Sequence, residues 1–150
     1  MLDSFKIGAF GVLLLAMGGG ALANDKDLQA QLPEDVKWVQ RRASPDVYYA
    51  GIYGTPDKPG PYAFRVRAQA GHRLPPHTHP DERTVTVLSG TYWSGVGESF
   101  DESRLRAFPA GSFYVIPAGV PHFSAILSGE VEFQEAGVGP SSHDLVVPPK

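Results

Sequence analysis

The feature that most limits the fold of this chain is a succession of short runs rich in β-branched and aromatic residues. The runs cover residues 47–53, 62–69, 84–88, 91–96, 112–116, 122–127 and 130–135. Val, Ile, Thr, Tyr and Phe favour strands, and the glycines and prolines between the runs favour turns. No long helical pattern interrupts the series, so the sequence predicts an all-β domain, either an antiparallel barrel or a sandwich.

The separators between these runs predict where the chain reverses direction. GTPDKPGP at 54–61 holds three prolines and two glycines, and the Ser-Gly pairs at 89–90 and 128–129 are typical of short hairpin corners. The 17 glycines and 14 prolines are spread between apolar runs. We therefore interpret them as turn residues of a folded domain rather than as a sign of disorder.

The first 23 residues have the pattern of a secretory signal peptide. Lys6 precedes an apolar stretch that runs from Ile7 to Met17, and Ala21-Leu22-Ala23 offers small residues at the two positions that a signal peptidase reads. We expect cleavage after Ala23, a periplasmic or secreted protein, and no membrane attachment after cleavage. A retained N-terminal anchor is the alternative, because the charge of the first few residues is weak.

The remaining chain is predicted to be a single domain without disulfide bonds. An N-terminal arm at 24–45 precedes the β-barrel at 46–150, and the sequence contains no cysteine. The net charge is −3, and the Lys and Arg residues are scattered rather than gathered into the basic stripe that nucleic acids require. We therefore expect no nucleic-acid partner.

Two histidines two residues apart indicate a metal site. His77 and His79 in PPHTHP share one face of an extended strand, because side chains alternate along a strand. His122 follows the turn IPAGVP later in the chain, and an antiparallel barrel can bring such a strand beside the first. Three neutral imidazoles suit Fe, Mn, Zn, Ni or Cu. His72, beside a turn, and His143, near the end of the chain, are expected to be exposed.

The segments around these histidines resemble the two conserved motifs of the cupins. GHRLPPHTHPDERTVTVLSG at 71–90 is similar to the first motif: Gly, five residues, His-x-His, three or four residues, Glu, six residues, Gly. GSFYVIPAGVPHFSAI at 111–126 is similar to the second: Gly, five residues, Pro-x-Gly, two residues, His, three residues, Asn. The resemblance implies a single cupin jelly-roll barrel of two antiparallel sheets, similar to small exported bacterial cupins of undefined function. It also implies one divalent transition metal at His77, His79 and His122.

The chain departs from each motif at one position. Arg83 stands where the first motif has its ligand Glu, and Ile126 replaces the Asn that closes the second motif. The first departure bears directly on the metal, because a guanidinium group stays charged and repels a nearby cation.

Three explanations of Arg83 remain open. A β-bulge would rotate Glu82 into the site as a fourth ligand, although the parity that Arg83 shares with Val85 and Val87 argues against it. A bare three-histidine site would leave positions for water or substrate, with Arg83 paired to a substrate anion. In the third explanation there is no metal, and Arg83 and the histidines bind an anionic or polar small molecule.

These motifs lead us to expect a metal-binding cupin that acts on a small organic molecule. Dioxygenase-type chemistry is the first expectation, followed by lyase or isomerase chemistry, and all three rest on family analogy alone. The alternative is a non-catalytic cupin that binds a small anion without metal. Cupins commonly pair, so the resemblance is also compatible with a homodimer in which the 24–45 arm crosses to the partner.

Overall fold

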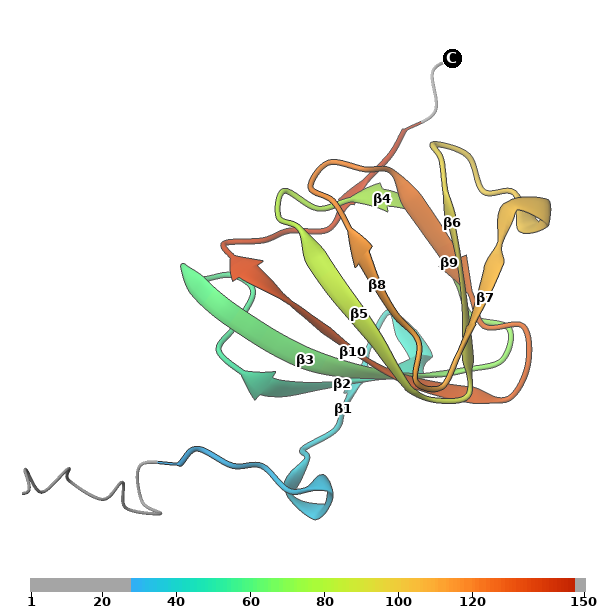
Figure 1. The fold of residues 1–150 in the computed structure, drawn as a ribbon. Coiled ribbons are helices and arrows are strands. Elements are labelled where there is room, and N and C mark those ends of the chain that lie inside the picture. The colour runs from blue at the N-terminus through green and yellow to red at the C-terminus, as the bar shows by residue number, and fades with distance from the viewer. Residues whose placement is uncertain (1–27, 148–150) are drawn as a thin grey trace, which may run out of the picture. The chain divides into compact units, whose positions relative to one another are not determined.

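The runs of β-forming residues are strands in the computed structural model, which describes residues 28–147. Contacts divide the chain into Met1–Ala30 and Gln31–Lys150, and the fold described below is that of the second part. Its strands are β1 (Val39–Arg41), β2 (Ser44–Tyr53), β3 (Gly60–Gln69), β4 (Arg73–Thr78), β5 (Arg83–Ser89), β6 (Thr91–Val96), β7 (Arg106–Pro109), β8 (Phe113–Ile116), β9 (His122–Ala125), β10 (Glu130–Gly139) and β11 (Asp144–Leu145). Two short 3-10 helices, η2 (Pro33–Asp35) and η3 (Glu102–Arg104), complete the described elements (Figure 1).

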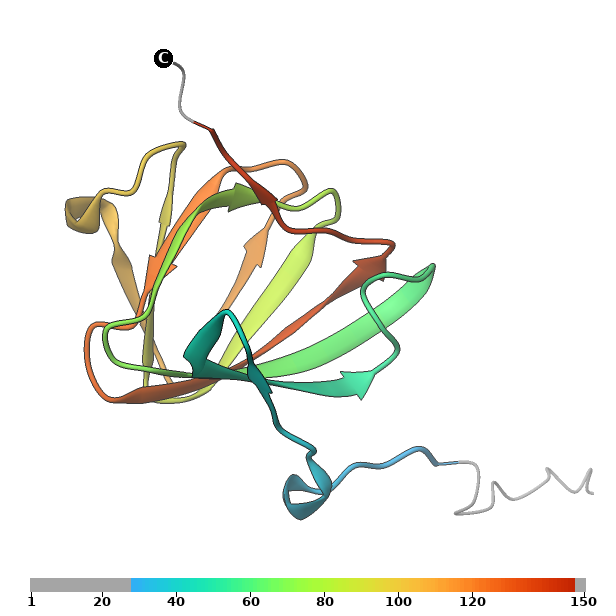
Figure 2. The ribbon, with the colours of Figure 1, turned by 180° about the vertical axis from the view of Figure 1, so that it is seen from behind.

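The strands form two sheets that face one another across the core (Figures 1 and 2). One sheet has the order β1-β2-β3-β10-β5-β8 and the other β11-β4-β9-β6-β7, with every neighbouring pair antiparallel. The core between them is filled by buried apolar side chains, among them Val47, Val66, Val85, Val87, Tyr92, Ile126, Val131 and Phe133. The predicted fold class, an antiparallel double-sheet jelly roll, is confirmed.

The predicted turns are real, but two of them connect different sheets. Residues 54–59 join β2 to its hydrogen-bonded neighbour β3, as predicted. The Ser-Gly pairs at 89–90 and 128–129 instead lead from β5 to β6 and from β9 to β10, so the predicted hairpins are corners between the sheets. Gly90 is required at its corner, because φ is 70° and an added Cβ would lie 2.2 Å from the carbonyl oxygen of Glu130.

Four strands have no counterpart among the predicted runs: β1, β4, β7 and β11. β4 contains Pro75 and Pro76, which cannot donate backbone hydrogen bonds, and its register with β9 shifts between Leu74 and His77. The other three are short strands at sheet edges, where a local β-forming pattern is not required. β4 and β11 matter most for function, because they lie next to one another at the histidines.

Several predictions concern parts of the molecule that the structure does not describe. The signal peptide at 1–23 lies outside the described residues, so cleavage after Ala23, the periplasmic or secreted location and the homodimer stay predictions. Within the predicted arm at 24–45, residues 39–41 form β1 and pair with β2. Among residues 28–147, the structure contains no helix with the length and hydrophobicity of a membrane span.

Candidate metal centre

His77, His79 and His122, which we call the histidine cluster, meet inside the barrel. His77 lies in β4 directly opposite His122 of β9, and His79 follows the end of β4. Ring centroids are 4.1 Å apart for His77 and His122, 4.8 Å for His77 and His79, and 5.1 Å for His79 and His122. One ligand nitrogen from each residue lies within 4.8 Å of the others, and all three side chains are buried.

Backbone carbonyl groups orient all three rings and fix the same tautomer in each of them. Nδ1 of His77 lies 2.8 Å from the carbonyl oxygen of Pro75, and Nδ1 of His122 lies 2.9 Å from that of Val120. Nδ1 of His79 lies 2.6 Å from the carbonyl oxygen of Ser142. A carbonyl oxygen can only accept, so each Nδ1 carries the proton and each Nε2 keeps its lone pair. This arrangement fixes metal-binding histidines in proteins.

Burial keeps the rings uncharged at neutral pH. Desolvation lowers the pKa of His77 to about 3 and the pKa of His79 to about 4, and it also lowers the pKa of His122. The neighbouring imidazoles add to these shifts, as does the positive charge of Arg83 at His79 and His122. Neutral imidazole is the form that binds a metal, so protons do not compete for the site near pH 7.

Glu82 does not reach the histidine cluster. Its side chain is exposed, and β5 pairs with β8 from Arg83 onward with no register shift. Arg83, Val85 and Val87 are all buried, as their shared parity predicted. The bulge that would have turned Glu82 into a fourth ligand is therefore absent from this part of β5, and that explanation of Arg83 is wrong.

Arg83 points inward, where its charge is matched by two carboxylates. Nη1 donates to Glu135 at 2.8 Å, Nη2 donates to the hydroxyl of Ser141 at 2.7 Å, and Nε lies 3.6 Å from Asp81. Nη2 also lies 3.4 Å from the carbonyl oxygen of Ser142. We call Arg83, Asp81, Glu135 and Ser141 the arginine cluster. When both carboxylates are ionised, the formal charge of the arginine cluster is −1, although the guanidinium group itself still lowers the pKa of His79 and His122.

The two carboxyl groups of the arginine cluster have different environments. Burial raises the pKa of Glu135, although the charge of Arg83 acts in the opposite direction. Burial also acts to raise the pKa of Asp81, but hydrogen bonds from Ser141 and Tyr62 outweigh it and hold that pKa below its usual value. Asp81 thereby links β3 to the segment that follows β10.

The chain after β10 closes one side of the histidine cluster. β11 pairs with β4, so that Leu145 lies opposite His77. His143 is exposed, as expected, but its ring stacks on His77 at a centroid distance of 4.1 Å and an interplanar angle of 21°. The sequence does not reveal this contact with His77, because an isolated histidine near the end of the chain has no spacing relation to the two motifs.

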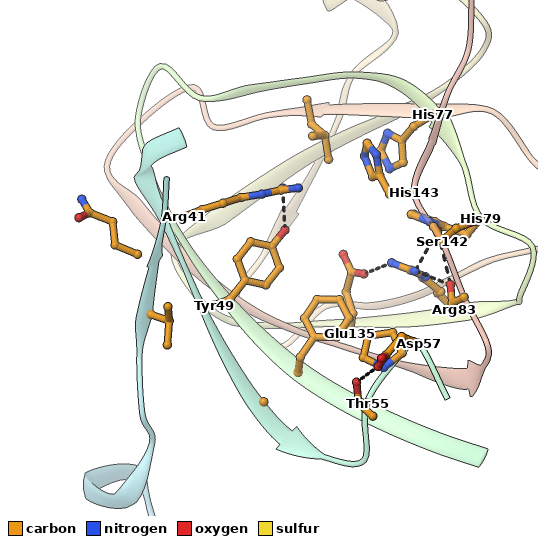
Figure 3. A pocket seen from close by; sticks show the side chains of 17 residues that line it. Arg41, Tyr49, Thr55, Asp57, His77, His79, Arg83, Glu135, Ser142 and His143 are labelled. Carbon is orange, nitrogen blue, oxygen red and sulfur yellow. Dashed lines mark hydrogen bonds and ion pairs between the residues drawn. The ribbon is translucent and has the colours of Figure 1, made fainter. Parts of the chain in front are cut away.

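A cavity of about 710 Å³ opens beside the histidine cluster (Figure 3). His77, His79, His143 and Arg83 lie on one side of it, and Arg41 and Tyr49 lie on the opposite side. The remaining lining residues are Val39, Gln40, Gly51, Thr55, Pro56, Asp57, Phe64, Leu74, Glu135, Ser141 and Ser142. His122 instead lines a second cavity of about 430 Å³ and is not among the residues that line the first.

Glu135 is the half-buried, inward-facing site residue that the sequence came closest to revealing. It lies opposite Phe64 of β3 and Val85 of β5, and it shares the parity of the buried residues Val131 and Phe133. A charged residue at an inward position of a strand needs a buried partner. That signal was present in EVEFQE, but only the fold shows that the partner is Arg83.

Comparisons with solved structures support the same fold. The chain is similar to the polyketide cyclase RemF from Streptomyces resistomycificus, with a TM-score of 0.67 and 20% identity, over 82% of this chain and 88% of that one. It is similar to the DMSP lyase DddQ from Ruegeria pomeroyi DSS-3, with a TM-score of 0.61 and 17% identity, over 77% of this chain and 63% of that one. It is also similar to an RmlC-like cupin from Shewanella frigidimarina NCIMB 400, with a TM-score of 0.57 and 13% identity, over 73% and 89% of the two chains.

No family model matches the chain, and no curated protein matches it. The structural neighbours nevertheless define the class of architecture, since a cupin and two named enzymes superpose on most of the barrel. The chain has the cupin fold, with three buried histidines at the positions that the two sequence motifs predicted.

Proposed function

We propose that this protein is a metal-dependent enzyme that acts on a small organic molecule in the cavity beside the histidine cluster. The observation that carries the proposal is the orientation of the three rings. Each Nδ1 donates a hydrogen bond to a backbone carbonyl oxygen, so the three Nε2 lone pairs remain available to one ion. Convergence of this kind has little structural value without a metal, because three desolvated imidazoles do not bond to one another.

The residues present fit a divalent transition metal. Imidazole donors suit Fe, Mn, Zn, Ni and Cu, and a three-histidine set leaves positions open for water or substrate. Arg83 does not oppose this assignment, since Glu135 and Asp81 lie against its guanidinium group. We assign the three ligands as His77, His79 and His122, and we leave the choice among the five metals to direct analysis.

Lewis-acid chemistry is the reaction type that this donor set favours. Three neutral ligands leave the full charge of a divalent ion to polarise a carbonyl or enol oxygen of the substrate. The chain itself orients the three donor rings through Pro75, Val120 and Ser142 and encloses the substrate in the cavity. Cyclase and lyase are the activities named for RemF and DddQ, and they are consistent with this choice.

Dioxygenase chemistry, the first expectation from the sequence, additionally needs a redox-active metal and oxygen. An oxygen electrode separates the two reaction types: a Lewis-acid enzyme consumes its substrate without oxygen uptake and keeps its activity when Zn²⁺ is the loaded metal. Turnover that needs both iron and oxygen would favour the dioxygenase.

Capture of a small anion without metal is the second candidate. The guanidinium groups of Arg41 and Arg83 both line the cavity, and this observation favours a ligand with negative charge. A pure binding module would hold its ligand in the absence of any metal and would show no loss of affinity after chelation.

Metal analysis of protein purified without an affinity tag tests the proposal. We expect the protein to hold about one equivalent of Fe, Mn, Zn, Ni or Cu, or to take up one when it is added. His122→Gln should lose this metal. His72→Gln is the matched control, because His72 bonds to Asp46 outside the histidine cluster and its loss should leave metal content unchanged. Content below about a tenth of an equivalent, not restored by added metal, would contradict the proposal.

A further inference from the structure

The arginine that faces the histidine cluster across the cavity is Arg41. It belongs to β1, lines the cavity, and extends from the edge of the sheet into that space (Figure 3). Its Nη1 lies 3.4 Å from the hydroxyl of Tyr49, and its guanidinium carbon lies 5.4 Å from the centroid of the Tyr49 ring.

Arg41 and Arg83 differ in whether a carboxylate lies beside the guanidinium group. Arg83 has Glu135 at 2.8 Å and Asp81 at 3.6 Å. Among residues 28–147, no carboxylate lies within ion-pair distance of Arg41, whose polar contact is the long one to the Tyr49 hydroxyl. A substrate anion would have to displace Glu135 to pair with Arg83, whereas Arg41 offers an unpaired guanidinium fork. The anion-binding role predicted for Arg83 is therefore better filled by Arg41.

An aromatic wall lies next to Arg41. The rings of Tyr49 and Phe64 are in contact, with centroids 5.7 Å apart, and both line the cavity. Gly51 lies two residues from Tyr49 on β2 and also lines the cavity, and an added Cβ there would meet no atom within 4 Å. The wall therefore has open space in front of it. A flat ring that packs against these side chains gains both apolar burial and favourable ring geometry.

We infer that the substrate is an aromatic carboxylate whose carboxylate pairs with Arg41, whose ring packs on Tyr49 and Phe64, and whose second oxygen substituent faces the histidine cluster. The inference rests on the proposed metal function for that last contact alone. The first two contacts involve Arg41, Tyr49 and Phe64, and they form whether or not a metal is bound. A cavity of about 710 Å³ is large enough for such a molecule.

The test uses 4-hydroxybenzoate and its neutral analogue 4-hydroxybenzamide, titrated into chelator-treated protein and followed by amide chemical shifts. Binding of the carboxylate should shift resonances of β1 and β2 around Gly51. Arg41→Gln should weaken this binding at least about tenfold, because a charge-assisted hydrogen-bonded pair is lost. Arg42→Gln is the matched control, since Arg42 is the neighbouring exposed arginine and does not line the cavity. It should change the affinity by less than about twofold.

Three results would overturn the inference: equal affinity in Arg41→Gln and the unaltered protein, equal affinity for the carboxylate and the amide, or binding that shifts resonances elsewhere. A comparison of the affinities for benzoate and cyclohexanecarboxylate tests the ring contact alone. Equal affinity for the two compounds would overturn the aromatic assignment. Because the titration is done without metal, failure of the metal proposal leaves this readout intact. Metal uptake by Arg41→Gln, measured in parallel, should equal that of the unaltered protein.

Discussion

The side chains of the histidine cluster are buried, and those of the arginine cluster are buried or half-buried. The polar partners of the two clusters come from different distances along the chain. His77 and His122 each bond to a carbonyl group two residues earlier. Arg83 bonds to Glu135 and Ser141, which are 52 and 58 residues away. Two of the three rings are thus oriented by carbonyl groups two residues away in the same segment, whereas the arginine cluster exists only after the fold is complete. A local motif can specify a metal ligand, but it cannot specify a buried charge network.

The two clusters meet at Ser142. Its carbonyl oxygen accepts from Nδ1 of His79, and it also lies 3.4 Å from Nη2 of Arg83. The third donor ring therefore depends on the same segment that the arginine cluster holds in place. Damage to the arginine cluster is therefore expected to weaken metal binding through His79, while the hydrogen bonds of His77 and His122 to their own carbonyl groups stay intact.

The largest effect is expected from Glu135→Gln. The change leaves Arg83 buried with a weaker partner, and breaking a buried ion pair from one side typically costs about 3–5 kcal/mol. Urea unfolding of the metal-free protein measures the loss. Glu130→Gln, on the same strand but in an exposed pair with Arg67, should cost less than about 1 kcal/mol.

A double-mutant cycle makes the same prediction sharper. Arg83→Met combined with Glu135→Gln removes both partners, so the coupling between the two changes should reach about 1–3 kcal/mol. Additive losses would mean that the two side chains do not depend on one another, and the compensation that we assign to Arg83 would then be wrong.

A smaller effect is expected from Ser141→Ala. The variant loses the hydrogen bond from Arg83 and the one to Asp81, which hold the segment that carries Ser142. We expect metal affinity to fall about tenfold, as when a group that orients a metal-binding histidine is removed. Competition with a chelator of known affinity measures the change. Ser103→Ala removes a similar hydroxyl contact to Asp101 in an exposed loop and should leave metal affinity unchanged.

A separate effect is expected in the pH dependence of the metal-free protein. The pKa of His77 is about 3 and that of His79 about 4 in the folded state, below the usual value of 6.5. The unfolded state therefore binds more protons in this window, so the free energy of unfolding should fall as the pH decreases from 6.5 toward 4. The slope is at most about 1.4 kcal/mol per pH unit for each histidine.

Urea unfolding at a series of pH values measures that slope, and His77→Gln should make it shallower. An unchanged slope in this variant would show that His77 does not titrate between the two states, and the acid sensitivity would then come from the other buried histidines, His79 and His122.

The sequence was sufficient for the fold class and for the convergence of three histidines, because both follow from local patterns. Strand runs repeat along the chain, and the two histidine motifs carry their own spacing. The parity of Arg83 with Val85 and Val87 also placed its side chain inside. What could not be predicted was the pairing of Arg83 with Glu135, because parity shows that a residue faces inward but not which residue lies opposite.

The short edge strands account for most of the other omissions. β1 carries Arg41 and β11 follows His143, and both are too short to show an alternating pattern. The two Ser-Gly corners were predicted as hairpins, since a turn signal does not indicate whether the next strand stays in the same sheet. Each of these features depends on which strands become neighbours.

The hydrogen bond that His79 donates to the carbonyl oxygen of Ser142 also has a consequence for the order in which the site forms. During synthesis His77 and His79 emerge first and His122 follows, but the group that orients His79 belongs to a segment made after β10. A growing chain that has reached only Gly139 holds all three donors and lacks the contact that fixes one of them. Tight binding of the proposed metal therefore requires the segment after β10, and a nascent chain that lacks this segment would bind the ion more weakly.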